Sequence, residues 1–297
     1  MTGLWSLVKR NSKMFFKDKA MFFTSLITPI ILLVLYATFL AKVYKDAFFG
    51  SFPPGLQIDE KLINGAVGGQ LVSSLLAVSC VTVAFCSNLL MVQDKISGAR
   101  RDLTMTPVKS YTLSLSYFIS CASVTLIISV TALGAGLIYL AATGWYISFT
   151  DILLLLLDIF LLVLFGTSLS SVISCNLSTN GQSSAVGTII SAGYGFICGA
   201  YMPISSFSDG LQNVIAFLPG TYGTSLLRNH ALRGVFEEMT NKGYPAEVIN
   251  TLKDSVDCNI YFFDNKVSQP IMFLILGLAA ALVTLGYIAI CKFRKNK

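Results

Sequence analysis

Several apolar runs in this chain are long enough to cross a lipid bilayer, and they constrain its fold more than any other feature. A spanning helix needs about 20 apolar residues, because each residue adds about 1.5 Å across a hydrocarbon core of about 30 Å. Runs at 21–41, 62–92, 112–142, 151–175 and 270–290 meet this length. Only 12% of the residues are charged, against roughly 25% in soluble domains. The sequence therefore predicts an all-α, polytopic membrane protein.

A sixth crossing is predicted from 183 to about 200, which brings the expected number of transmembrane helices to six. Residues 204–233 form two apolar stretches divided at Pro219, and each is too short to cross. Such stretches favour an outer re-entrant helical hairpin, whose backbone must be covered by protein or line a cavity. The more polar segments 42–61 and 234–269 are expected outside the cell, as a loop and an extracellular segment.

The first 20 residues have the pattern of an interfacial helix. Apolar side chains lie on one side of a helical wheel and basic ones on the other: Leu4, Leu7, Val8 and Phe15 against Lys9, Arg10, Lys13 and Lys17. We expect this helix to lie on the membrane as an anchor rather than to join the core. Most Lys and Arg fall in 1–20, in 93–111 and after 291, and such residues favour cytoplasmic loops. Both termini are therefore predicted in the cytoplasm, and the net charge of +6 does not indicate nucleic acid binding.

The polar break at 93–111 separates two of the predicted spans. Its basic residues are Lys95, Arg100, Arg101 and Lys109. Within it, Ile96, Ala99, Arg100 and Leu103 recur at the spacing of a helix. Pro107 cannot continue a helix, so we expect a short helix that lies across the inner surface and ends at Thr106. The alternative is an ordinary basic loop, since any multispan protein has amphipathic inner loops.

The run from Asp94 to Leu103, followed by Met105-Thr106-Pro107-Val108, resembles the signature of the membrane subunits of ABC-type-2 exporters. A second stretch, 199–228, is similar to the region around the fifth span of that family. The resemblance covers nearly the whole chain and implies one transmembrane domain over 1–297. It implies a coupling helix at 94–107 that docks on a separate ATPase, present in two copies, which would hold the ATP and magnesium. It also implies a second permease copy, in a homodimer or a related heterodimer.

The resemblance also implies which residues act. Coupling to the ATPase would involve Asp94, Ile96, Arg100, Arg101, Leu103, Thr106 and Pro107. The transport route would lie between the two copies, lined mainly by the first, second and fifth spans. Apart from the resemblance, the positions of Asp158, Tyr194 and Tyr201 within or near the ends of spans make them candidates for lining this route. The substrate would be amphipathic, such as a drug, a lipid-linked molecule or a peptide, exported across a bacterial plasma membrane.

Asp158 is the best single candidate for a functional polar residue, because a carboxylate near mid-span costs about 2.5–3.5 kcal/mol on insertion scales. It should face the bundle interior or a wet cavity, where it could line the route or take up a proton. The alternative is a carboxyl group held by a Ser, Thr or Tyr of a neighbouring span. The only histidine, His230, has no evident companion in the sequence.

No motif for catalysis, a cofactor or a metal is found in the sequence. It contains no P-loop and no G-x-S-x-G elbow, and no cysteine pair has metal-ligand spacing. Cys258 is the only cysteine predicted outside, so we expect no disulfide within the chain. Two other classes remain open: a secondary transporter or channel, which predicts intramembrane charge networks or inverted repeats, and a membrane-embedded enzyme. Within the family, a peptide resistance or sensing module is a further alternative.

Overall fold

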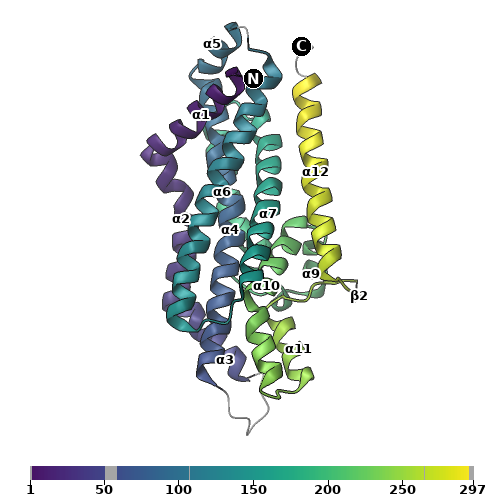
Figure 1. Cartoon of the computed structure of the whole chain (residues 1–297). Helices are drawn as coiled ribbons and strands as arrows, with labels where there is room; N and C mark the ends of the chain where they lie inside the picture. Colours follow the sequence, from purple (N-terminus) through teal and green to yellow (C-terminus); the bar gives the residue numbers. More distant parts are fainter. Residues whose placement is uncertain (1, 51–58, 107, 264, 294–297) are drawn as a thin grey trace.

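The computed structural model describes residues 2–50, 59–106, 108–263 and 265–293 and is a bundle of long helices (Figure 1). Part of the predicted outer loop, Pro107 and the end of the basic tail lie outside the described residues. Among the described residues, five helical stretches are long and apolar enough to cross a membrane: Lys19–Asp46, Glu60–Ile96, Ser110–Thr143, Phe149–Asn176 and Gln269–Lys292. They coincide with the five long runs predicted from the sequence.

The elements follow one another in this order: α1 (Thr2–Lys17), α2 (Lys19–Leu35), a π-helical turn (Tyr36–Leu40), α3 (Ala41–Gly50), α4 (Glu60–Ile96), α5 (Ala99–Met105), α6 (Ser110–Thr143), α7 (Phe149–Asn176), α8 (Asn180–Ile197), a 3-10 turn (Ile204–Ser206), α9 (Asp209–Ile215), α10 (Pro219–Asn241), α11 (Ala246–Ser255), β1 (Tyr261–Phe262), β2 (Asn265–Lys266) and α12 (Gln269–Phe293). The two short strands form an antiparallel hairpin in which Tyr261 pairs with Lys266. The start of α1 and the last turn of α12 lie at the same end of the bundle as α5, and α3 and α11 lie at the other end (Figure 1). We call these the α5 end and the α11 end.

α4 is the central helix, and nearly all of its side chains are buried against α2, α6, α7, α8 and α10. Inside a membrane, small residues favour such contacts because they let helix backbones approach closely. A Cβ added at Gly166 of α7 would lie 2.9 Å from the Cys80 carbonyl oxygen of α4. Gly65 and Gly69 of α4 face two different neighbours, since a Cβ added at Gly65 would meet the ring of Tyr146 and one added at Gly69 would meet Leu232 of α10.

The N-terminal helix is packed more deeply than the sequence predicts. Leu7 and Phe15 of α1 are buried in a cluster with residues of α4, α6 and α12, so part of its apolar face meets protein rather than lipid. Trp5 and Phe16 stay exposed, at 70% and 42%, and remain available to a membrane interface. The helix ends because Asp18 caps α2, accepting a hydrogen bond from the Met21 N–H.

The expectation of a loop from residue 42 is wrong over its first part. After the π-helical turn the chain stays helical through α3 as far as Gly50. Tyr44 and Phe48 are buried in the main core, whereas Lys42 and Lys45 are on the outer side of this helix. The polar composition at 42–50 therefore reflects an amphipathic helix, whose apolar face is covered by the bundle.

The predicted boundary between 204–233 and 234–269 is also wrong. α10 continues past Arg233 to Asn241, because Val235, Phe236 and Met239 extend its buried face. α11 adds Val248, Ile249 and Leu252 to the same core. The segment expected to be separate and polar is thus packed onto the α11 end of the bundle (Figure 1).

Candidate functional site

A lateral groove of about 770 Å³ lies between α2, α4 and α8. The apolar residues that line it include Ile27, Ile31, Leu35, Phe39, Leu89 and Phe196, and the hydroxyl-bearing residues are Thr24, Thr28, Ser183, Ser184, Thr188 and Tyr201. Ile27, Ile31 and Phe39 on one wall and Phe196 on the other are about half exposed, so both walls continue into open apolar faces. An apolar space with scattered hydroxyl groups suits an amphipathic molecule.

Only one of the three predicted route residues lines this groove. Tyr201 does so, and its ring packs edge-on against Phe196 with centroids 5.1 Å apart. Tyr194 is buried behind the groove, where its hydroxyl lies beside Gly220 at the start of α10. Asp158 is buried on α7, which contributes no residue to the groove lining.

The short inner helix starts later than predicted. Gly98 adopts a left-handed conformation with φ +83°, which favours glycine, and it separates α4 from α5. Asp94 and Ile96 therefore belong to the end of α4, and only 99–105 form the short helix. No α5 residue is buried. Figure 1 shows α5 projecting beyond the long helices.

Some of the predicted coupling residues are exposed to solvent, and others are bound or packed within the chain. Ile96 is 42% exposed, and Arg101 and Thr106 are exposed as well. Met105, which sequence reasoning missed, is 76% exposed and is the most prominent apolar side chain of α5. The sequence could have indicated Met105, because it follows Arg101 by four residues and residues four apart lie on one face of a helix. Leu103 is partly buried against the cluster that contains Leu7 and Phe15.

Asp94 does not belong to the exposed surface, because its carboxylate is buried and bound within the chain. The Arg10 guanidinium donates to both carboxylate oxygens, at 2.6 and 3.0 Å, and the Tyr117 hydroxyl donates a third hydrogen bond. The hydrogen bond to Asp94 raises the pKa of Arg10 above its ordinary value. The neighbouring Lys95 ammonium donates to three backbone carbonyl oxygens at the end of α7, those of Ser174, Cys175 and Leu177. The base of α5 is thus fixed to α1, α6 and α7.

Two pairs of buried polar side chains were missed by sequence reasoning. His230 has a companion after all: its Nδ1 lies 2.6 Å from Asp158 Oδ2, so the expectation of a Ser, Thr or Tyr partner was wrong. Arg228 pairs with Asp257 at 2.7 Å and also donates to the Gly199 carbonyl oxygen. The sequence signal for this second pair was a lone Arg within an apolar stretch.

A protein-family comparison identifies the class of chain that carries these features. The family described as ABC-2 type transporter matches residues 2–231, which include α1, the groove helices and α5. No curated protein matches the sequence.

Proposed function

The chain belongs to the ABC-2 type transporter family and is a permease component of an ABC transporter, and from this premise we propose that it exports an amphipathic substrate. ATP would be hydrolysed on a separate ATPase subunit, with two ATPase copies serving two permease copies. The membrane would be the plasma membrane, with α5 and both termini on the cytoplasmic side.

The observation that carries the proposal is that α4 joins the groove to the base of α5. Cys86 and Leu89 of α4 line the groove, and Asp94 at its end is bound to Arg10 and Tyr117. Leu89 and Asp94 are about 7.5 Å apart along the helix axis. A force applied to α5 would therefore reach the groove wall through a short, continuous length of helix.

A second copy of the chain would close the groove. Residues of α2 and α8 that face away from the bundle are apolar and exposed, among them Ile30, Val34 and Ile189. In lipid, such faces associate through packing rather than through a hydrophobic driving force, and the small residues of α8 favour close contact. The route would then run between two copies.

We also propose that α8 makes the sixth crossing, with α9 and the start of α10 as the outer re-entrant hairpin. α7 ends beside Lys95 at the α5 end, and α12 begins near Asn229 of α10. The chain has to return between these points, and α8 is the helix that does so. Its 18 residues give about 27 Å, which is close to the hydrocarbon thickness.

The docking test substitutes an exposed α5 residue and measures the recovery of an ATPase. Met105→Asp should reduce copurification of a nucleotide-hydrolysing protein from mild detergent by about 30-fold, the effect of losing a central interface contact of about 2 kcal/mol. Leu103→Asp is a poorer choice, since Leu103 packs partly against the core. Met202→Asp, the same change at an exposed site remote from α5, is the control. Equal recovery for both variants would refute docking through α5.

The route test fills the groove. Gly187 lines it and has open space where a Cβ would be added, as has Gly277 on α12, outside the groove. Gly187→Trp should abolish substrate-stimulated ATPase activity, and Gly277→Trp should retain it.

The second candidate, a proton-coupled transporter, is favoured by the Asp158–His230 pair. Transport by the purified chain in vesicles without ATP would establish that alternative and refute the exporter.

A further inference from the structure

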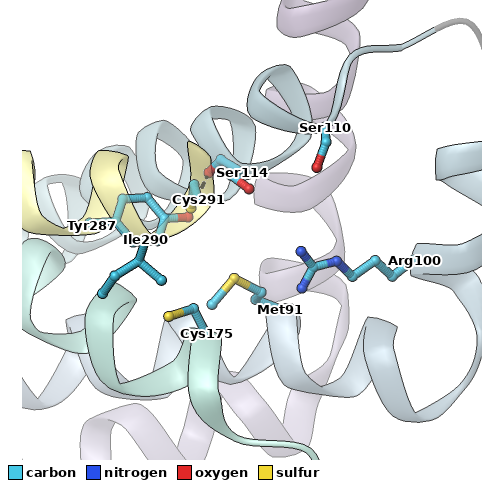
Figure 2. A pocket seen from close by; sticks show the side chains of 8 residues that line it. All are labelled: Met91, Arg100, Ser110, Ser114, Cys175, Tyr287, Ile290 and Cys291. Carbon is cyan, nitrogen blue, oxygen red and sulfur yellow. Dashed lines mark hydrogen bonds between the residues drawn. The ribbon is translucent and has the colours of Figure 1, made fainter. Parts of the chain in front are cut away.

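A second, small cavity lies at the α5 end of the bundle, away from the groove. Its volume is about 70 Å³, and it is lined by side chains of α4, α5, α6, α7 and α12 (Figure 2). Its lining includes Arg100, Ser110, Ser114, Met91, Tyr287 and Ile290.

Arg100 is the unusual member of this cavity. Figure 2 shows its guanidinium reaching from α5 into the space between Met91 and Ser110. Two other basic residues at this end of the bundle are paired: Arg10 with Asp94, and Lys95 with the end of α7. Among the described residues, Arg100 has neither a hydrogen-bond acceptor nor a carboxylate within ion-pair distance. A half-buried cation without a hydrogen-bond or ion-pair partner among the described residues is suited to an anion from outside the chain.

The other polar groups of the cavity also fit an anion. Ser110 and Ser114 add hydroxyl donors, and no Asp or Glu is among the lining residues. The Tyr287 hydroxyl is already used, since it donates to the Ser114 carbonyl oxygen at 3.0 Å. A water-sized atom requires about 10–15 Å³ of cavity volume, so this cavity of about 70 Å³ has room for about five atoms. That is the size of a phosphate group rather than of a whole ligand.

The position of the cavity indicates where the phosphate comes from. It lies where α4 ends and α6 begins, and exposed apolar residues follow its lining residues along α6 and α12: Tyr111 after Ser110, Leu115 after Ser114 and Ile288 after Tyr287. Acyl chains can lie along these faces while a headgroup reaches the cavity. Basic pockets between spanning helices on the cytoplasmic side are typical sites for anionic lipid headgroups.

We propose that this cavity binds the phosphate of an anionic phospholipid, with Arg100 as its charged ligand and the Ser110 and Ser114 hydroxyls as additional donors. The lipid would attach α5 to the membrane at its first turn. Arg100, expected from the sequence to contact the ATPase, would face the lipid instead, while Arg101 remains on the exposed side. The site does not depend on whether an ATPase docks on Met105.

Adjacent arginines provide a matched pair of variants for the test. The purified chain in detergent is titrated with phosphatidylglycerol, and bound lipid is counted by native mass spectrometry. Arg100→Gln should weaken binding at least about tenfold, as expected for losing a charge-assisted contact. Arg101→Gln, with the same change of charge one residue later, should bind as the unsubstituted chain does. Equal losses in the two variants would overturn the proposal.

Three further measurements keep the result unambiguous. Arg100→Lys retains a charge and should recover part of the affinity, which separates lost binding from lost folding; no recovery in a folded variant overturns the assignment. Phosphatidylcholine should bind more weakly than phosphatidylglycerol, and equal binding overturns the preference for an anionic lipid. Inorganic phosphate at millimolar concentration should not displace the lipid. Displacement would reassign the cavity to free phosphate and overturn the lipid as its occupant.

Discussion

Substituting the Arg228–Asp257 pair is the strongest single test of which contacts stabilise the α11 end of the bundle. Arg228 is fully buried and Asp257 nearly so, and they join α10 to the segment after α11. The same carboxylate accepts backbone N–H groups of Ile204 and Ser205, at 2.9 to 3.3 Å. The guanidinium also binds the Gly199 carbonyl oxygen. Four separate segments therefore meet at one pair of charges.

The two single substitutions should differ in cost. Removing one member of a buried pair destabilises a protein by about 3–5 kcal/mol, because the other charge stays buried. After Arg228→Met, Asp257 still accepts the backbone N–H groups of Ile204 and Ser205, so we expect the lower value, about 3 kcal/mol. After Asp257→Asn, Arg228 cannot lose its proton and keeps only neutral acceptors, so we expect about 5 kcal/mol.

Reversible unfolding in mixed micelles, followed by circular dichroism, measures these free energies. The double variant Arg228→Met/Asp257→Asn removes both charges of the pair and keeps an amide oxygen for the backbone N–H groups of Ile204 and Ser205, so it should cost less than the sum of the two single costs. Lys242→Met is the control, because it breaks the solvent-exposed pair between Lys242, which follows α10, and Asp59, which precedes α4, and it should leave the midpoint unchanged. If the single costs simply add in the double variant, the coupling of the two charges is refuted.

Three other predictions concern packing and reactivity. Asp158→Leu leaves the His230 ring without its hydrogen-bond partner and should cost about 1–3 kcal/mol, whereas Asp158→Asn keeps a hydrogen bond and should cost less; equal unfolding midpoints would contradict this. Gly166→Ala would overpack the contact with α4 and should cost about 1–3 kcal/mol, while Gly277→Ala, in open space, should be neutral or stabilising in the same assay. Burial raises the pKa of the Cys258 thiol to about 12, so the thiol stays protonated and its maleimide labelling should not increase between pH 7 and pH 9. Rapid labelling of the folded chain, or a disulfide-linked dimer on a non-reducing gel, would contradict this burial.

The sequence predicts the long helices well because length and hydrophobicity alone decide whether a segment can cross a bilayer. α4, α6, α7 and α12 lie where the apolar runs place them. It fails at α3 and at the second half of α10, where polar residues on one helix face resemble a loop. The apolar faces of these helices are covered only by tertiary packing, which a single sequence does not specify.

The candidate site could be predicted only in outline. The position of the inner helix follows from the polar break, but its first residue depends on the conformation of Gly98. The companions of Asp94, Asp158 and Arg228 are Arg10, His230 and Asp257, each far away in the chain. Pairings of this kind depend on which helix faces turn toward each other, and hydrophobic periodicity in spans that are apolar all round does not show this.

The π-helical turn at Tyr36–Leu40 has a consequence for the register of the helix that follows it. In an α-helix, residues seven apart lie on nearly the same face, and residues eight apart are rotated by about 80°. Tyr36 and Tyr44 are eight apart, yet their rings stack with centroids 5.7 Å apart and an interplanar angle of 14°. The wider turn absorbs one extra residue, so α3 presents Tyr44 to the same core as Tyr36. Removing one residue from this turn would leave an ordinary α-helix in which Tyr44 follows Tyr36 by seven positions, so Tyr44 and Phe48 would still face the bundle. Closing the turn into an α-helix without removing a residue would instead rotate the side chains beyond it by about 100° and turn them away from the core.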